Sequence, residues 1–116
     1  MGVAKRRGEA GESLAAEYLN LIGWDVHERN LRVAGVEVDL LARDDRTDVL
    51  VEVKLRSRSD FGGAVWAVDR RKHERLRRAA RALVHAGARI VRIDVVAVEF
   101  EEDGVRLRHF RNAITE

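Results

Sequence analysis

The sequence has no cysteine and no proline, and aromatic residues make up only 5% of its 116 positions. Without cysteine the chain can form no disulfide scaffold, no Cys-based zinc site and no thiol nucleophile. No apolar run approaches the ~20 residues of a transmembrane helix, so we expect neither a membrane span nor a membrane partner. Residues 1–7 carry cations with no apolar segment behind them, unlike a secretory signal. We therefore expect a cytoplasmic protein.

The rest of the composition is that of one globular domain. Hydrophobic residues reach 46%, too many for a disordered chain, and charged residues reach 36%, too many for a membrane protein. The sequence has no repeat and no linker that would divide it. Residues 1–116 are therefore predicted to form a single domain around one core.

The net charge is only +2, but the charges are unevenly distributed. Cations dominate residues 69–89 and recur at residues 5–7, whereas acids gather at residues 44–45 and 99–103. Such a distribution lets one face of a nearly neutral protein approach a polyanion. A basic helix whose side chains are merely solvated explains the same pattern, and both interpretations stay open at this stage.

Hydrophobic spacing predicts the element order α-β-β-β-α-β-β. Helical periodicity begins near residue 11 and stops at Gly23, and it returns between Asp69 and Gly87. Strands are expected over residues 24–32, 36–41, 49–55, 90–100 and 105–110. The apolar strand at 90–100 is expected inside the sheet, and the last strand at its edge. The prediction is an α/β fold, a mixed sheet flanked by helices.

Two of these strands carry the residues that could perform chemistry. Side chains two apart in a strand share a face, so Glu52 and Lys54 project together, and Asp39 projects from the preceding strand. If the turn at residues 44–48 makes a hairpin, Asp39 and Glu52 lie close together. Converging carboxylates repel unless a cation is present, and Mg²⁺ favours one or two carboxylates with phosphate oxygens. Lys54 would add a positive charge beside the attacking water or the phosphate.

A purely structural interpretation of the same residues is also open. Asp39 could belong to the polar side of an exposed strand. Glu52 and Lys54 could pair with neighbours across the sheet, which would contribute ~0.2–1 kcal/mol per pair.

Other polar residues are expected to be structural. Asp94 interrupts the apolar strand and needs a cationic or hydrogen-bonding partner, which we expect to be an arginine of the second helix. His27, His85 and His109 have no metal-ligand spacing, so we expect them on the surface or in packing.

Asp39 followed by Glu52-Val53-Lys54 resembles the active-site signature of the PD-(D/E)XK nuclease superfamily. More specifically, the chain is similar to the YraN family of small bacterial proteins, and the likeness spans nearly the whole sequence. The matching segments are Gly11-Glu12, Leu14 to Leu19, Glu28 to Arg32, Asp39 to Asp44, Val51 to Lys54, Phe61-Gly62, Lys72, Leu76, Asp94 to Val96 and Asn112-Ala113.

The resemblance implies a restriction-endonuclease-like fold and a metal site. Asp39 and Glu52 would hold Mg²⁺ or Mn²⁺, with the main-chain carbonyl of Val53 as a third ligand. Lys54 would orient or activate the hydrolytic water. Glu12 matches an acidic residue that archaeal Holliday-junction resolvases of this superfamily contribute to the site. A glutamate that the helix dipole favours in the first turn is the alternative for Glu12.

The chain departs from the family pattern at two places. Val36 stands at the first position of the relatives' Gly-Glu-Ile-Asp motif and Gly35 lies one residue early, so a different turn is expected there. His73 follows the helix lysine where relatives often carry glutamine. A histidine could assist the lysine or the water, but its charge would vary with pH.

The resemblance and the basic helix together predict a Mg²⁺- or Mn²⁺-dependent endonuclease acting on DNA in repair, recombination or processing. Contacts to the phosphate backbone of DNA do not distinguish one base sequence from another, so we expect selectivity for branches, flaps or ends. The residues expected to bind the DNA backbone are Arg7, Arg70, Arg71, Lys72 and Arg75. The alternatives are a non-catalytic nucleic-acid-binding accessory module and an RNA-processing nuclease. A homodimer, which a two-fold-symmetric junction would require, and a repair or DNA-uptake protein partner are further expectations.

Overall fold

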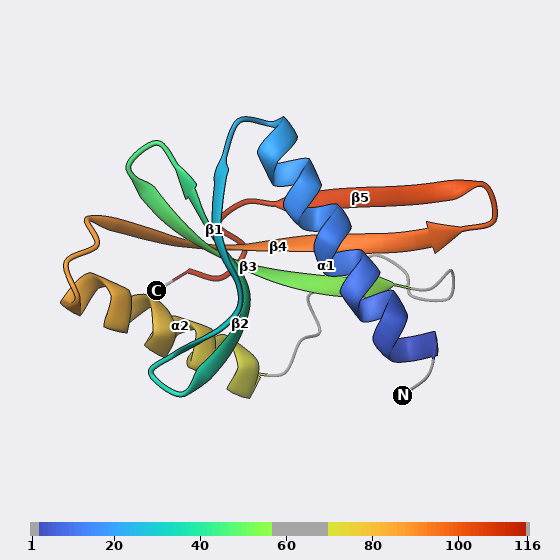
Figure 1. Ribbon diagram of the computed structural model, residues 1–116. Helices are drawn as coiled ribbons and strands as arrows, with labels where there is room; N and C mark the ends of the chain where they lie inside the picture. The colour runs from blue at the N-terminus through green and yellow to red at the C-terminus, as the bar shows by residue number, and fades with distance from the viewer. Residues whose placement is uncertain (1–2, 57–69, 116) are drawn as a thin grey trace.

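The computed structural model describes residues 3–56 and 70–115, with side chains described from residue 8 onward (Figure 1). Phe61 and Gly62 lie outside the described residues. The elements are α1 (Val3–Leu21), β1 (Asp25–Val33), β2 (Val36–Asp44), β3 (Thr47–Arg56), α2 (Arg70–His85), β4 (Ile90–Glu101) and β5 (Gly104–Phe110). The strands form one sheet in the order β1-β2-β3-β4-β5, in which β3 and β4 are parallel and the other neighbours antiparallel. The predicted α/β order is confirmed, with β4 inside the sheet and β5 at its edge.

The first helix is longer than the sequence predicted. α1 begins at Val3 rather than near residue 11. The prediction followed the apolar stripe, which starts at Leu14, whereas the alanine, lysine and arginine residues before Gly8 are good helix formers that need no buried face. Within the described residues, no helix is both long and apolar enough to cross a membrane.

Both helices end at the glycines that the sequence indicated. Gly23 and Gly87 have φ values of 95° and 111°, a left-handed conformation that favours glycine. After α1 the Trp24 N–H donates to the Leu19 carbonyl at 3.0 Å, which closes a Schellman motif. The chain therefore turns sharply, and Trp24 enters the core directly after the helix.

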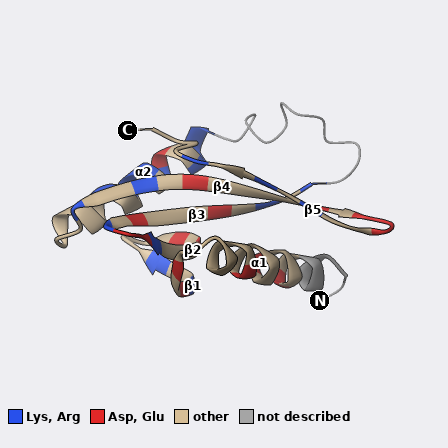
Figure 2. Ribbon diagram, turned by 90° about the horizontal axis from the view of Figure 1, so that it is seen from above, with Lys and Arg blue, Asp and Glu red and all other residues tan. Residues whose placement is uncertain are grey.

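The helices cover opposite faces of the sheet (Figure 2). On one face α1 packs Ala15 and Leu19 against strand residues that include Val51 and Val96. On the other face α2 packs its stripe against the sheet, and the buried residues of that layer include Leu50, Leu76, Ala79, Ala80 and Ile93. The apolar stripe predicted for each helix thus packs against a different face of the sheet.

Strands β2 and β3 separate halfway along their length and form a fork. Their ladder stops at the pair Leu40–Val51. Beyond that pair β2 continues beside β1, whereas β3 continues beside β4. At the same place β2 passes from one core to the other. Leu40 belongs to the core on the α1 side, and Val38 belongs to the core on the α2 side. Asp39 and Glu52 come directly after the last pair, so they stand at the mouth of the fork.

The turn that leads into β2 is regular despite the displaced glycine. Ala34 and Gly35 connect β1 to β2 with φ values of 51° and 77°, and Val33 pairs with Val36 across them. Positive φ at both central residues is typical of a type I′ turn, whose twist matches that of a hairpin. The early position of Gly35 therefore supplies a left-handed residue to a tight two-residue turn.

Asp94 is buried in β4, and its partners are not the ones that the sequence predicted. Arg92 donates to both carboxylate oxygens at 2.8 and 3.0 Å, and the Asn112 N–H donates at 2.9 Å. His109 Nε2 lies 2.8 Å from Oδ2. The expected arginine of α2 is wrong because Asp94 shares the α1 face of β4 with Val96, away from α2.

The hydrogen bonds of Asp94 extend into a network across the α1 face. Burial alone would raise the pKa of Asp94, but bonds from His109 and Arg92 outweigh it and hold that pKa below its ordinary value. His109 Nδ1 lies 2.8 Å from the Tyr18 hydroxyl, so one imidazole ring bridges Asp94 and Tyr18. The network ties α1 to β4 and β5.

We predict that Asp94→Asn lowers the free energy of unfolding by about 3 kcal/mol at pH 7, because Arg92 loses its counter-charge. Urea denaturation measures the difference. A depressed pKa stabilises the fold only above that pKa, so the difference from the parent should shrink as the pH falls below ~3.9, the ordinary value. Glu102→Gln, in the exposed β4–β5 turn, is the control. Equal losses in the two variants would contradict the structural role of the network.

Candidate active site

Asp39 lies at the mouth of the fork, where its carboxylate replaces a missing strand partner. Its Oδ2 accepts a hydrogen bond from the backbone N–H of Val53 at 2.8 Å. Beyond the pair Leu40–Val51 the two backbones no longer form a ladder, so the side chain satisfies a donor that β2 would otherwise have met. This bond directs the Asp39 carboxylate toward β3.

Glu52 is the buried carboxyl of the fork, with 6% of the residue exposed. Burial, a hydrogen bond with the Asp39 carboxyl and the charge of Asp39 raise the pKa of Glu52 to about 8, while Lys72 opposes this rise. The two carboxyls are thus in contact, as the predicted hairpin implied. The nearby negative charge of Asp39 thus disfavours the ionised form of Glu52.

Lys72 of α2 reaches the fork, a position that the sequence did not indicate. Its Nζ lies 3.0 Å from Glu52 Oε2, an ion pair, although this buried oxygen has no hydrogen-bond partner of good geometry among the described residues. Lys72 precedes the buried Leu76 by one helical turn, so both project toward the sheet. That spacing is visible in the sequence, but the surrounding arginines favour assigning Lys72 to DNA binding instead.

Glu12 approaches the Asp39 carboxyl from α1, the helix on the other side of the sheet from α2. Burial and the charge of Asp39 raise the pKa of Glu12, and a hydrogen bond with Asn30 opposes the rise. Gly11 allows this approach, because a Cβ there would lie 2.6 Å from Leu55 Cδ2 in β3 and the Leu55 side chain would have to move. Asn30 was not predicted, and its only signal was its place in the segment that resembles the YraN family.

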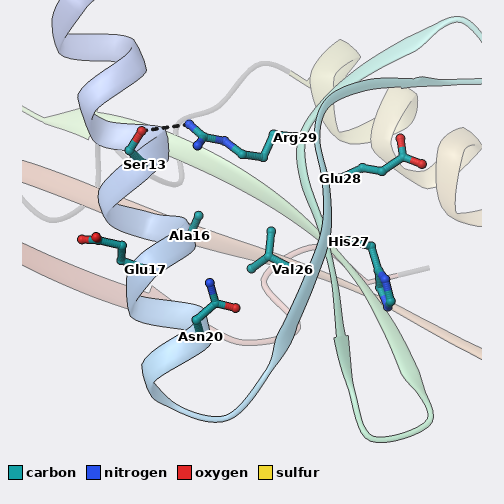
Figure 3. Close-up of a pocket in the computed structure, with 8 residues that line it drawn as sticks. All are labelled: Ser13, Ala16, Glu17, Asn20, Val26, His27, Glu28 and Arg29. Carbon is teal, nitrogen blue, oxygen red and sulfur yellow. Dashed lines mark hydrogen bonds between the residues drawn. The ribbon is translucent and has the colours of Figure 1, made fainter.

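A hollow of about 650 Å³ lies between α1 and the edge strand β1 (Figure 3). Arg29 crosses it from β1 and donates to Ser13 Oγ at 2.9 Å, and its charge opposes the raised pKa of Glu12. Figure 3 shows Glu17 and His27 pointing away from each other, so the lining does not converge on a reaction centre. The hollow is related to the candidate site through Arg29, which lines it and whose charge acts on Glu12.

Lys54 follows Glu52 on the same face of β3, as strand alternation predicts, and it is half-buried. No described residue forms a hydrogen bond or an ion pair with its ammonium group. This charge is therefore not committed to structure within the described part of the chain.

The other predicted DNA-binding residues lie on or near the exposed side of α2. Arg70, Arg71 and Arg75 are exposed there, whereas the side chain of Arg7 in α1 lies outside the described residues. Their predicted contacts with DNA stay a prediction.

The fork fits a divalent cation that uses two protein carboxylates. Asp39 and Glu52 interact, and Glu52 Oε2 is buried without a hydrogen bond to any described residue, so a cation could stabilise the ionised form of Glu52. Mg²⁺ commonly takes one or two carboxylates and completes its shell with water. Among the described side chains, no three of His, Asp or Glu are grouped to hold an ion. Glu12 therefore does not complete a cluster of three, and it acts on the pair through its charge.

The amino-acid sequence matches the model of the uncharacterised protein family UPF0102 over residues 11–98. It is 50% identical over 108 residues to the UPF0102 protein of Beutenbergia cavernae, covering 90% of this chain and 92% of that protein. A UPF0102 protein of Parafrankia sp. is 42% identical over 118 residues, covering 97% of this chain and 99% of the relative. One from Halorhodospira halophila is 39% identical over 112 residues, with coverages of 97% and 89%.

The fold is also similar to a solved structure, that of Pyrococcus furiosus SfsA in complex with Ca²⁺, with a TM-score of 0.50. The match covers 93% of this chain and 63% of that one, at 15% sequence identity, so the likeness concerns the fold alone. With the strand order and the two flanking helices, it identifies a restriction-endonuclease-like fold.

We predict that the Glu52 carboxyl titrates near pH 8 in metal-free protein. Lys72→Met should raise this pKa further, because the ammonium favours the carboxylate. Arg46→Met, in the β2–β3 turn, removes the same charge elsewhere and should leave the pKa unchanged. Carbon-13 NMR of the side-chain carboxyls measures both effects. A parent value near the ordinary 4.5 would contradict the Asp39–Glu52 contact.

The same raised pKa predicts how stability depends on pH. Between about 4.5 and 8 the folded state holds a proton on Glu52 that the unfolded state has lost. The free energy of unfolding should therefore fall as the pH rises through this window, and Glu52→Gln should flatten the slope. Urea denaturation at several pH values tests this, and a slope that is identical in parent and variant would count against it.

Proposed function

This chain belongs to the uncharacterised protein family UPF0102, also known as YraN, and we propose that it is a divalent-metal-dependent phosphodiesterase acting on DNA. The reaction would be hydrolysis, in which water attacks the phosphorus and the bond to the leaving oxygen breaks. The observation that carries the proposal is the contact between the Asp39 and Glu52 carboxyls at the mouth of the fork. The restriction-endonuclease-like fold supports it, and the similar SfsA chain was solved with a divalent cation, Ca²⁺.

A structural role explains the carboxyl pair poorly. Glu52 is buried and stands beside a second acid, Asp39, and the raised pKa of Glu52 reflects the cost of both its burial and that neighbour. An amide or an apolar residue would fill the position without it. Perturbed acids of this kind are common at catalytic and metal-binding sites, where the missing partner is the ligand.

In this proposal some residues at the fork bind the metal ion, and others act on the water or the phosphate. Asp39 and Glu52 would hold Mg²⁺ or Mn²⁺, with the main-chain carbonyl of Val53 as the proposed third ligand. When bound, such a cation lowers the pKa of water and offsets the charge on phosphate oxygens. Lys54 would donate to the attacking water or the phosphate, because its ammonium has no partner in the described structure. Glu12 adds a negative charge beside Asp39, which favours a cation there.

The charge on α2 supports a polyanionic substrate. Figure 2 shows cations concentrated on α2, whereas the tip of the β4–β5 hairpin is acidic. Arg70, Arg71 and Arg75 would bind backbone phosphates, which gives affinity without reading bases. We therefore propose that the shape of the DNA, such as a branch, flap or end, decides where it is cleaved.

Metal binding can be tested before any substrate is chosen. Calorimetry should detect one Mn²⁺ in the parent and none in Asp39→Asn or Glu52→Gln. Asp48→Asn, on the same strand as Glu52 but paired with Arg43, is the control and should bind normally. Because Glu52 must lose its proton, the affinity should rise up to about pH 8, and the heat at pH 7 should depend on the buffer. Equal binding by all variants would place the ion elsewhere.

Cleavage by rigorously purified protein tests the activity itself. With Mn²⁺ and branched, flapped and linear DNA, we expect Glu52→Gln and Lys54→Ala to lose at least 100-fold in rate, as expected when a charged group at the reacting centre is removed. Asp48→Asn should cleave like the parent. DNA that is bound but never cleaved would favour the accessory-module alternative, and faster cleavage of matched RNA would favour RNA processing. Activity that survives all site variants would point to a contaminant.

A further inference from the structure

A basic groove lies between the β1–β2 turn and α2, beside the fork. It has a volume of about 370 Å³, and its described lining consists of Gly35 of the turn, Val36 and Glu37 of β2, and Arg32, Lys72, Arg75 and Arg78. Because Lys72 also lies 3.0 Å from Glu52, the groove begins where the carboxyl site ends. Glu37 is the one acid among the described residues that line it.

The cations on α2 form a row that leads away from the fork. Lys72, Arg75 and Arg78 are three residues apart, so they lie on one side of the helix. With a rise of ~1.5 Å per residue, the row extends about 9 Å along the helix axis. A nucleic-acid strand in a duplex advances ~3.4 Å per nucleotide, so the row is long enough to follow more than one phosphate.

Two of these three cations, Arg75 and Arg78, take no part in holding the described structure together. Arg75 and Arg78 form no hydrogen bond or ion pair with any residue in the described part of the chain. Arg77, between them, is different: it donates to Glu74 at 2.6 Å and to the Thr115 carbonyl at 2.7 Å. The contrast separates an arginine that has a structural partner from two that face the groove without one.

Arg32 and Glu37 leave the groove open to an anion. Their ion pair, 2.9 Å long, sits at the rim, and both side chains are largely exposed, at 66% and 75%. An exposed pair of this kind contributes little to stability and is readily rearranged. While Glu37 is paired with Arg32, the charge of Arg32 offsets that of Glu37. Glu37 then does not offset the positive charge of Arg75 and Arg78.

We propose that this groove is a second phosphate subsite, which holds the backbone phosphate next to the one that is cleaved. Guanidinium groups match phosphate oxygens with paired hydrogen bonds, which suits Arg75 and Arg78 to this role. The polynucleotide would leave the fork along α2, past Lys72, toward the C-terminal end of the helix. The subsite rests on the proposed function, from which it takes the position of the scissile phosphate.

The test compares two double variants that lose the same charge. Arg75→Gln/Arg78→Gln removes the groove cations, and Arg46→Gln/Arg89→Gln removes two from another groove, whose lining also contains Asp45 and Asp48. Fluorescence anisotropy with a labelled single-stranded oligonucleotide, in EDTA and at several salt concentrations, measures affinity. The first variant should bind the oligonucleotide at least about tenfold more weakly than the parent. The slope of its log affinity against log salt concentration should be shallower by ~1 for each phosphate contact that is lost. The second variant should bind nearly like the parent.

Each other outcome has a distinct meaning. Equal weakening in the two variants would show that only net charge matters and would overturn the subsite, as would a parent that does not bind the oligonucleotide. Inorganic phosphate should compete only weakly, and competition as strong as that of the oligonucleotide would assign the groove to a free anion instead. Oligonucleotide binding that depends on Arg75 and Arg78, in a protein that never cleaves DNA, would support the subsite and overturn the phosphodiesterase.

Discussion

The site depends on the contact between the Asp39 and Glu52 carboxyls, and that contact depends on the fork in the sheet. A regular ladder between β2 and β3 would have continued past Leu40 and Val51. Because the strands separate there, the Val53 N–H needs another acceptor, and the Asp39 carboxylate supplies it. The same separation leaves the buried Glu52 carboxyl beside the half-buried Asp39 carboxyl, so that Glu52 cannot be solvated freely. The irregularity of the sheet thus brings two carboxyl groups together at one position.

The two helices bring further charges to this position from opposite faces. α2 places Lys72 against Glu52 because the buried stripe that contains Leu76 fixes the rotation of the helix. α1 brings Glu12 toward Asp39 at the point where Gly11 keeps the helix close to β3. The hydrogen bonds from Tyr18 through His109 to Asp94 tie α1 to the central strands, away from the fork. The hydrogen-bond network around Asp94 and the candidate site are therefore placed in different parts of the fold.

The features predicted correctly from the sequence are those that depend on residues close together in the chain. Hydrophobic periodicity and the glycines at helix ends gave the element order, and the hairpin register placed Asp39 opposite Glu52. The partner of Asp94 was wrong because periodicity does not say which face of the sheet α2 covers.

The missed features of the site depend on distances between elements. The reach of Lys72 depends on how closely α2 packs on the sheet, which no spacing reveals. The end of the β2–β3 ladder has no sequence signal either, because both strands keep alternating beyond it. For the same reason the groove beside the β1–β2 turn could be seen only once that turn and α2 were placed together.

The most direct test of the central claim is the position of a bound ion. Crystals grown with Mn²⁺, and measured for anomalous scattering, should show one peak in coordination distance of oxygens from both Asp39 and Glu52, with the contact between the two carboxyls broken. No peak at the fork, with the two carboxyls still in contact while Mn²⁺ binds elsewhere, would contradict the account.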